Sequence, residues 1–451
     1  MGRLIVAMSA VVSGRSAWLL LGFTGMAYSM GLSALWAAIG YIIVEFFLFF
    51  YYAVRIRRFT EKYDCITLTD FFTQRFHDPK GYLRFVVVLI IIIFMVAYVS
   101  AQFVAGGKAL ATSFNIDYRT GLILTTGIIL LYVVIGGFLA VSLNDTIQAF
   151  IIIFALIIVP VKSIIDFGGW NQFFTMLREQ SSGSFIDPLA LSAGALIGFL
   201  GIGLGSPGNP HIISRYMSIK STRSLPSVAL IGTLANIIMA TGALFIGLVG
   251  RLYFPDSGML PDADTENLYP VLAWGHLHPF IFGLVIASIF AAIVSTADSQ
   301  LLVAGSAVVR DIYEKWLMNG KTVSQKKLVF LSRAIITLLV LTALIMGWLA
   351  GELVFWLVLF AWAGLGAAFG PTSILALYWK KTTRQGVTAG VVTGALTVII
   401  WNQVDFLKNI IYELVPAFFL AFIVTVIVSL VTKAPEESQE MIETMIKPKP
   451  G

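Results

Sequence analysis

Runs of about 20 consecutive apolar residues recur along the whole chain, and this pattern constrains the fold more than any other feature of the sequence. Each run is long enough to cross the hydrocarbon core of a bilayer as a helix. The composition agrees with such crossings, since 58% of the 451 residues are hydrophobic and 12% are charged, which is about half the charged fraction of ordinary soluble domains. The sequence therefore predicts an all-α polytopic membrane protein in contact with lipid.

The apolar runs predict twelve membrane-spanning helices. They cover residues 4–29, 32–54, 82–113, 119–138, 144–165, 189–214, 224–252, 273–309, 327–349, 353–379, 386–403 and 408–432. Lys and Arg gather in the links that follow even-numbered spans and in the C-terminal segment, so both termini are expected in the cytoplasm. The segment TLTDFFTQRF (67–76) is expected to form a short interfacial helix, and 433–451 a solvated cytoplasmic tail.

Two of these spans are interrupted by residues that break helices. The first carries AVVSGRSAW, and the sixth carries GIGLGSPGNPH, with four glycines and two prolines between Gly201 and Pro210. Backbone groups freed at membrane depth need a cavity, water or an ion. The interruptions open two successive blocks of five spans, and paired broken helices in corresponding halves indicate the binding site of a transporter. Two independent kinks at packing glycines are the alternative interpretation.

The eighth span presents a stripe of small polar groups inside an apolar helix. Ala292, Ser295, Thr296 and Ser299 follow one another at i, i+3, i+4 and i+7, so they share one face. Uncharged oxygens at fixed positions suit a hard monovalent cation such as Na+, whereas small residues also serve close packing between membrane helices. A partner helix with free backbone carbonyls would favour the cation site over simple helix packing. The first span is such a partner, because its break frees carbonyls.

Several segments resemble the sodium/solute symporter family, and in particular its sodium/proline symporter branch. They are GGFLAVSLNDTIQAF (136–150), FAAIVSTADSQLL (290–302), FAWAGLGAAFGP (360–371), TLTDFFTQRF and GNPHIISRYM (208–217), within a similarity that covers essentially the whole chain. The resemblance implies a leucine-transporter-like fold of two inverted five-helix repeats followed by two accessory helices. The repeats would cover 1–165 and 189–379, the accessory helices 386–432 and the tail 433–451. Members usually have one more helix before the first core helix, and this chain is expected to lack it, through a truncated start or a natural loss.

The resemblance also implies a sodium site where the first and eighth spans meet. The ligands would be the backbone carbonyls of Val12, Arg15 and Ala292 and the side chains of Ser295 and Thr296. The polar stripe of the eighth span points to the same two hydroxyls. Neutral oxygens would hold a monovalent ion weakly enough to release it during transport.

Beside this site the chain departs from the sodium/proline branch, which has an Asp-Met pair where this chain has Gly14 and Arg15. Arg15 falls near the middle of the first span, where a charge is costly and is usually paired or functional. We expect it to pair with Asp298 or with an anionic group of the substrate. The alternative is that it points into a wet cytoplasmic vestibule and has no specific role.

Substrate contacts in the proline branch come from two aromatic positions and a proline of the sixth helix, which match Ile202, Ser206 and Pro210 here. Because the aromatic residues are absent, the resemblance implies a small organic solute, such as an amino or carboxylic acid, rather than proline itself. Ser13 and Ser16 are further candidates for contacts with its polar groups.

Two carboxylates are candidates for the ion pathway. Asp145 matches a family aspartate along the sodium exit route, although a lone carboxylate after Asn144 could equally be a helix N-cap. Asp298 follows the hydroxyl pair by two residues and would be buried, with a structural hydrogen bond as the preferred interpretation. His211 and Lys108 are interpreted as packing or helix-end residues.

Together these features predict a sodium-coupled symporter that imports a small organic solute by alternating access across the cell membrane. The alternatives are proton coupling through Asp145 or Asp298, and a transport-inactive solute sensor or fragment. The sequence shows no metal-ligand cluster, nucleophile–base arrangement or phosphate loop, so no enzymatic function is expected. The net charge of +6 is no reason to expect nucleic acid, and the single cysteine, Cys65, excludes an intramolecular disulfide.

Overall fold

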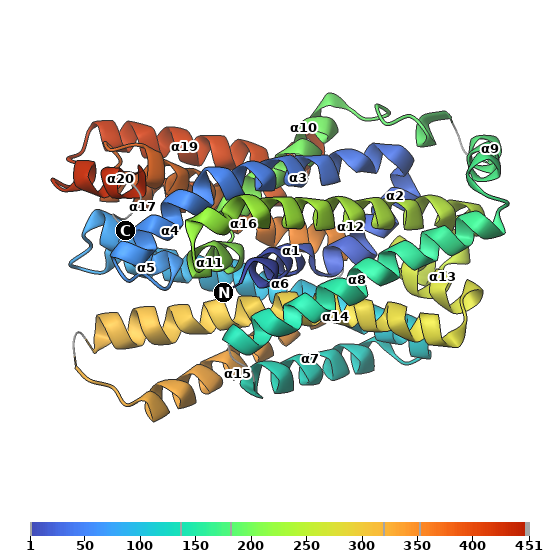
Figure 1. Ribbon diagram of the computed structural model, residues 1–451, viewed down its shortest axis with the longest axis horizontal. Helices are drawn as coiled ribbons and strands as arrows, with labels where there is room; N and C mark the ends of the chain where they lie inside the picture. Colours follow the sequence, from blue (N-terminus) through green and yellow to red (C-terminus); the bar gives the residue numbers. More distant parts are fainter. Residues whose placement is uncertain (1, 136–137, 181–182, 319–320, 351–352, 447–451) are drawn as a thin grey trace.

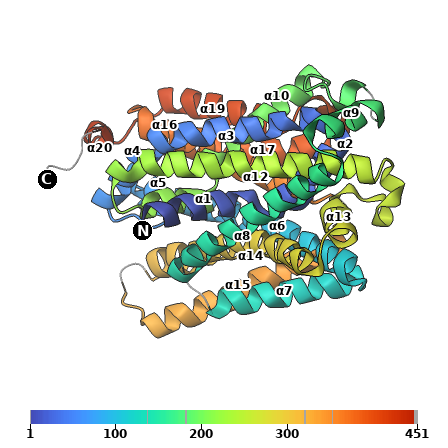
Figure 2. The same ribbon diagram turned by 45° about the vertical axis from the view of Figure 1, so that its right-hand side comes forward.

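The computed structural model of the protein describes residues 2–135, 138–180, 183–318, 321–350 and 353–446. Within these ranges the chain is built of helices, most of which run roughly along the longest axis of the molecule (Figures 1 and 2). Nine of the described helical segments are long and apolar enough to cross a membrane, and Ala193–Gly208 and Leu414–Leu430 are shorter apolar helices. The segment Arg3–Phe50 has 48 residues, enough for two crossings of about 20 residues. The prediction of an all-helical polytopic membrane protein is confirmed, and the exact number of spans stays a prediction.

The first half of the chain contains the first broken helix. Its elements are α1 (Arg3–Ala17), η1 (Trp18–Phe23), α2 (Thr24–Met30), α3 (Leu35–Phe50), α4 (Tyr52–Lys62), α5 (Leu68–Phe76), α6 (Tyr82–Phe114), α7 (Tyr118–Ile135) and α8 (Phe138–Asp166). The segments α1, η1 and α2 follow one another as one interrupted helix, in which η1 is a π-helix.

The second half begins, after α9 (Trp170–Gln180), with the second broken helix. Its elements are α10 (Ala193–Gly201), η4 (Ile202–Gly208), α11 (Pro210–Ser218), α12 (Leu225–Tyr253), α13 (Leu268–His276), α14 (Pro279–Ser306), η9 (Ala307–Leu317), α15 (Gln325–Leu349), α16 (Val354–Tyr378), α17 (Arg384–Gln403), α18 (Asp405–Ile410), α19 (Leu414–Leu430) and α20 (Ser438–Ile446). The expected span 273–309 is divided between α13 and α14, because the His278 side chain caps a new helix that has proline at its first position. The expected span 408–432 is likewise divided, between α18 and α19.

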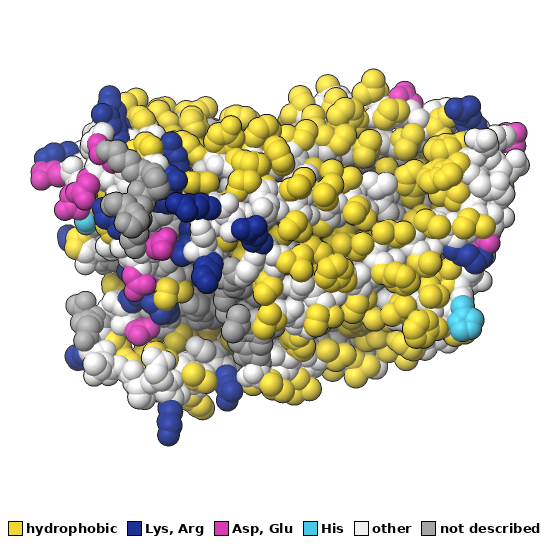
Figure 3. All heavy atoms as spheres, viewed as in Figure 1, with side chains coloured by type: hydrophobic (Ala, Val, Ile, Leu, Met, Phe, Trp, Pro, Cys, Tyr) yellow, Lys and Arg dark blue, Asp and Glu magenta, His cyan; other side chains and the backbone are white. Residues whose placement is uncertain are grey.

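The surface separates into a broad apolar band and charged ends (Figure 3). In the view of Figure 3, Lys and Arg side chains gather most densely at the left, together with acidic ones. This end, called the charged end below, is formed by α4, α5, α20 and the start of α15 (Figure 1). Such a distribution suits a protein whose middle contacts lipid and whose ends contact water.

The segment expected to be an interfacial helix forms α5, which begins with a capping box between Thr67 and Asp70. The helix itself is confirmed, but all of its side chains except that of Gln74 are buried or nearly so. It therefore packs inside the charged end instead of lying on the surface.

The C-terminal segment is more ordered than expected. Residues 438–446 form α20, whose Met441 and Met445 are 1% and 0% exposed. The Arg58 guanidinium donates to the Met445 carbonyl at 3.2 Å, and Lys62 Nζ donates to Thr444 Oγ1 at 2.9 Å. The expectation of a solvated tail was wrong for this part of it, because an apolar face of α20 is buried against α4. Residues 447–451 lie outside the described part of the chain.

At the opposite end of the molecule a loop carboxylate holds three segments together. Glu266 accepts the backbone N–H of Val354 at 2.9 Å and of Phe355 at 2.8 Å, at the start of α16, and it pairs with Lys108 of α6 at 2.7 Å. Burial raises the pKa of Glu266, although the Lys108 ammonium opposes this rise. Lys108, expected to be a packing or helix-end residue, is therefore a member of a partly buried ion pair.

Candidate functional site

The first broken helix is interrupted at Ser16. This residue has φ 45° and ψ −172°, outside the helical region, and α1 ends at the next residue. A positive φ is strained for a residue other than glycine, so the surrounding contacts must hold it. The Trp18 N–H donates to Ser16 Oγ at 3.1 Å and to the carbonyls of Arg15 and Ser16. The break predicted in the first span is confirmed.

The second broken helix passes from α10 through the 3-10 turn η4 into α11. Close packing against α16 requires glycine here, since a Cβ on Gly205 would lie 2.0 Å from Trp362 Nε1. Side chains satisfy carbonyls that the interruption frees. Trp362 Nε1 donates to Ile202 O at 2.8 Å, and Asn209 Nδ2 donates to Gly205 O at 2.8 Å. This break, too, lies where the sequence predicts it.

Helix α14 brings its hydroxyl pair against α1 beside the first break. Thr296 Oγ1 donates to Ser13 O at 3.4 Å, and Ser295 Oγ donates to Ala292 O at 3.1 Å. Ser295 and Thr296 are both completely buried. Oxygens without formal charge therefore meet between two helices, and oxygen is the ligand that hard cations prefer.

The two α1 carbonyls expected to complete this set belong to Val12 and Arg15. Both residues are buried, and Val12 directly precedes Ser13, whose carbonyl contacts Thr296. The Arg15 carbonyl accepts the Trp18 N–H, and a carbonyl has a second lone pair for another partner. The residues present thus fit a bound monovalent cation.

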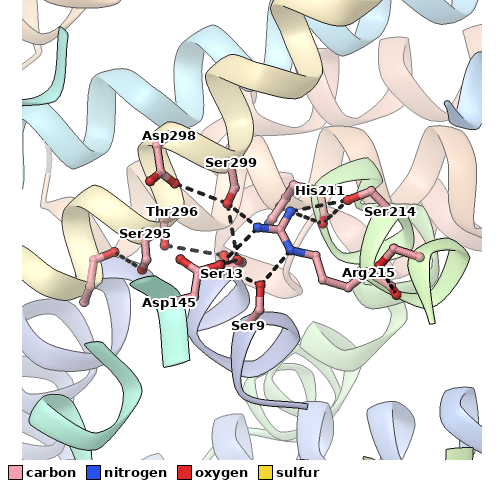
Figure 4. A network of polar contacts seen from close by, with 12 residues as sticks. Ser9, Ser13, Asp145, His211, Ser214, Arg215, Ser295, Thr296, Asp298 and Ser299 are labelled. Carbon is pink, nitrogen blue, oxygen red and sulfur yellow. Dashed lines mark hydrogen bonds and ion pairs between the residues drawn. The ribbon is translucent and has the colours of Figure 1, made fainter. Parts of the chain in front are cut away.

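A second polar group, called the Arg215 cluster below, lies next to these hydroxyls (Figure 4). It consists of Ser9 and Ser13 from α1, Asp145 from α8, Arg215 from α11, and Asp298 and Ser299 from α14. The Arg215 guanidinium is at its centre, with Nη2 at 3.2 Å from Asp145 Oδ2 and 2.5 Å from Ser299 Oγ. Ser9 Oγ donates to Asp145 Oδ2 at 2.6 Å and accepts from Arg215 Nε at 3.0 Å. The cluster therefore ties four helices together at one point.

The Arg215 cluster corrects two interpretations of the sequence. Asp145 lies inside α8, seven residues after its first residue, so it is not the helix N-cap. Arg215 follows directly after the expected sixth span, 189–214, and the sequence therefore placed it among the Lys and Arg of the links that set orientation; it is instead 0% exposed, because α11 continues the broken helix to Ser218. Asp298 accepts from Ser299 Oγ at 3.3 Å, which agrees with the expected hydrogen-bonding role.

Arg15 does not pair with Asp298, and this expectation was wrong. Its guanidinium forms an ion pair with Glu45 of α3, donates to Asn236 Oδ1 of α12 at 2.9 Å, and stacks on the Tyr41 ring at 3.7 Å. At 2% exposure it does not point into a wet vestibule either. Glu45 is the only charged residue of the apolar helix Leu35–Phe50, and this lone charge is the sequence signal that could have identified the partner.

Two of the five residues expected to contact the solute have hydroxyls that are bonded to buried carboxylates. Ser13 Oγ lies 3.5 Å from Asp145 Oδ2, inside the Arg215 cluster. Ser206 Oγ donates to Glu45 Oε1 at 3.1 Å. The other three lie at the breaks, since Ser16 forms the first, and Ile202 and Pro210 begin η4 and α11 of the second.

A cavity of about 780 Å³ leads from the charged end toward this region. Its walls include Arg57 and Arg310 at that end, and Pro210, Ser214 and Leu302 further inside. Ser214 Oγ also accepts from Arg215 Nη1 at 3.3 Å, so the cavity borders the Arg215 cluster.

Several buried hydrogen-bond donors around the first break were not predicted from the sequence. Trp18 Nε1, Tyr41 Oη and Gln102 Nε2 are buried and have no hydrogen-bond partner among the residues that the structure describes. Gln102 Oε1 accepts the Ala17 N–H at 3.1 Å, and the Trp18 and Tyr41 ring centroids are 6.0 Å apart. A glutamine inside an apolar span was the signal available for Gln102.

The Arg215 cluster generates a stability prediction. Arg215→Leu removes the counter-charge of a buried carboxylate, so we expect it to destabilise the protein by about 3 kcal/mol or more. Adding Asp145→Leu should recover much of this loss, because neither charge then remains unpaired. Thermal unfolding of the purified protein in detergent measures both effects, with the exposed Arg223→Leu as the matched control. A double variant at least as unstable as Arg215→Leu would contradict the pairing.

Comparisons with known proteins agree with this architecture. The chain matches the Sodium:solute symporter family over residues 1–394. A relative, the sodium/proline symporter of Staphylococcus aureus, is 37% identical over 450 residues, which cover 96% of this chain and 86% of the relative.

Solved transporter structures share the fold. A Na+-coupled sialic acid symporter in a substrate-bound outward-open state aligns with a TM-score of 0.80 at 17% identity, over 96% of this chain and 91% of its own. MhsT in complex with L-phenylalanine aligns with a TM-score of 0.60 at 16% identity, over 95% of this chain and 98% of its own. Mhp1, a nucleobase-cation-symport-1 family transporter, aligns with a TM-score of 0.57 at 11% identity, over 98% of this chain and 96% of its own. The leucine-transporter-like fold is thereby confirmed.

The two broken helices, the buried hydroxyl pair of α14 beside the first of them and these similarities lead to one conclusion. The chain belongs to the sodium:solute symporter family, and it is a transporter that couples solute import to sodium, not an enzyme.

Proposed function

We propose that Na+ binds where α14 faces the break in α1. The ligands are the carbonyls of Val12, Arg15 and Ala292 and the side chains of Ser295 and Thr296. One observation carries this proposal: Thr296 Oγ1 lies 3.4 Å from Ser13 O, so the α14 hydroxyls reach the α1 segment just before it breaks. The family's coupling to sodium supports the same assignment.

The solute, in this proposal, is a small amino acid or a related carboxylic acid bound between the two breaks. The candidate contacts are Ser13, Ser16, Ile202, Ser206 and Pro210. The buried donors of Trp18, Tyr41 and Gln102, which have no partner in the described chain, support a carboxylate, because an ionised carboxylate only accepts hydrogen bonds.

Proline is one solute to test, since the Staphylococcus aureus relative is named a sodium/proline symporter. The sequence favours other small solutes over it. Ile202 and Ser206 stand at the two positions where the resemblance to the proline branch implies aromatic side chains, so the contact with a pyrrolidine ring is reduced.

Coupling in this proposal arises at the first break. Sodium that bridges α1 and α14 would hold the α1 carbonyls in place and thereby complete the solute site on the same interrupted segment. Two ligands that stabilise one arrangement raise each other's affinity by the same factor. Alternating access then exposes the site to the two sides of the membrane in turn.

Proton coupling is the second candidate function. Asp145 Oδ1 and Asp298 Oδ2 are buried, and neither has a hydrogen-bond partner among the described residues. A carboxyl oxygen that has no partner offers a position where a proton can bind during transport. Uptake that follows pH instead of sodium would favour this candidate.

The protein is proposed to lie in the cell membrane with its charged end in the cytoplasm. Helix α1 begins, and α20 ends, toward this end (Figure 1). The enrichment of Lys and Arg there supports a cytoplasmic location for both.

Uptake of radiolabelled solutes into proteoliposomes tests the sodium site. With a panel of amino and carboxylic acids that includes proline, we expect uptake of at least one solute to require an inward sodium gradient. Ser295→Ala/Thr296→Ala should reduce it at least tenfold, since two of five proposed ligands are lost. Ser288→Ala, a buried serine of α14 that donates to Val285 O at 2.7 Å, is the matched control and should retain uptake. Full sodium-dependent uptake by the double variant would refute the site.

The orientation is tested by cysteine labelling in a Cys65→Ser background. Lys326 is exposed near the start of α15, at the charged end, and Glu179 is exposed on α9, which lies at the other end (Figure 1). A membrane-impermeant maleimide added to intact cells should label Glu179→Cys and not Lys326→Cys. The reverse pattern would show that the charged end faces outward.

A further inference from the structure

One buried polar group joins four helices where α3 and α12 pack beside the first break. It is called the Glu45 node and consists of Arg15 from α1, Glu45 from α3, Ser206 from η4 and Asn236 from α12. These residues are between 0% and 5% exposed. The node therefore contains one side chain from each of the two broken helices, held by two unbroken ones.

The Glu45 carboxylate is fully engaged within the node. Its Oε2 accepts from the Arg15 guanidinium and from Asn236 Nδ2 at 2.9 Å, and its Oε1 accepts from Ser206 Oγ at 3.1 Å. Asn236 Oδ1 in turn accepts from Arg15 Nε at 2.9 Å. A charge that is buried this deeply is tolerated only with such partners, and removing one partner leaves the other uncompensated.

The position of the node makes it more than a packing element. The Arg15 carbonyl is a proposed sodium ligand, and Ser16, where the helix breaks, is the next residue. A guanidinium on a ligand residue places a fixed positive charge within one side-chain length of the cation site. In a buried site with low effective dielectric this charge opposes sodium binding, unless a carboxylate neutralises it.

We propose that Glu45 is a positioning residue for sodium binding: its carboxylate neutralises the Arg15 guanidinium, so that the Arg15 carbonyl can accept a cation beside a side chain whose charge is already balanced. This inference rests on the proposed sodium site. It assigns a role to a residue of α3, which supplies none of the proposed sodium ligands.

An electrostatic role and a purely structural role of the node predict different changes in sodium affinity for Arg15→Met and Glu45→Gln. If the node only holds helices together, Arg15→Met and Glu45→Gln should both weaken sodium binding or leave it unchanged together. If Glu45 offsets the charge of Arg15, Glu45→Gln weakens sodium binding, because the guanidinium remains, whereas Arg15→Met does not weaken it. The double variant, which carries neither charge, then binds sodium like the wild type.

Equilibrium binding of radioactive sodium to purified protein in detergent tests this directly, without requiring transport. We expect Glu45→Gln to raise the half-saturating sodium concentration about tenfold or more, Arg15→Met to leave it no higher than in the wild type, and Arg15→Met/Glu45→Gln to restore it to within about threefold. Glu413→Gln is the matched control, since Glu413 of the accessory region is also 5% exposed, and it should leave sodium binding unchanged.

Unchanged binding in Glu45→Gln, weaker binding in Arg15→Met, or no recovery in the double variant would overturn the inference. If Glu45→Gln does not fold, the other two variants still decide it, because Arg15→Met must bind sodium at least as tightly as the wild type and the double variant no more than about threefold more weakly. Ser295→Ala/Thr296→Ala separates the two proposals. Sodium binding that survives this change refutes the proposed site itself, whereas binding that is lost there but indifferent to Glu45→Gln refutes only the role of Glu45.

Discussion

A helix that is interrupted inside a membrane leaves backbone groups that lipid cannot satisfy, so the protein must supply their partners. In this chain the interruption of α1 at Ser16 imposes that requirement, and the surrounding helices are arranged to meet it. The Ser16 hydroxyl, Gln102 and the hydroxyl of Thr296 provide partners for the backbone around the break. A cation bound to the remaining carbonyls would meet the same requirement, which is why a break and an ion site belong together.

Two buried ion pairs flank this interruption on different sides. Arg15 and Glu45 link α1 to α3, with α12 and η4 in the same node, whereas Arg215 and Asp145 link α11 to α8, with α1 and α14. The first group joins the two broken helices to each other. The second joins them to α8 and α14 and borders the cavity. A rearrangement that opens the site to the charged end would have to disturb the second group, while the first could persist.

Local signals in the sequence were sufficient for the all-helical membrane-spanning architecture, both breaks and the hydroxyl pair. Glycine and proline mark a break wherever they occur inside an apolar run, and Ser295 and Thr296 follow from helical periodicity alone. The partner of Arg15 was not accessible in this way. Glu45 and Asp298 are both lone carboxylates in apolar helices, and only the rotation and packing of α1 against α3 decide between them. Arg215 was misplaced because it follows an apolar run, although the helix continues through it, and the burial of Met445 depends on where α20 docks.

The central claim is that sodium and solute bind cooperatively at the first break. Once uptake has identified a solute, its affinity for the purified protein can be measured by calorimetry at graded sodium concentrations with choline as the replacement cation. The account predicts that solute affinity rises at least tenfold between sodium-free and saturating conditions, and that sodium affinity rises by the same factor when solute is present. Equal solute affinity with and without sodium would contradict it.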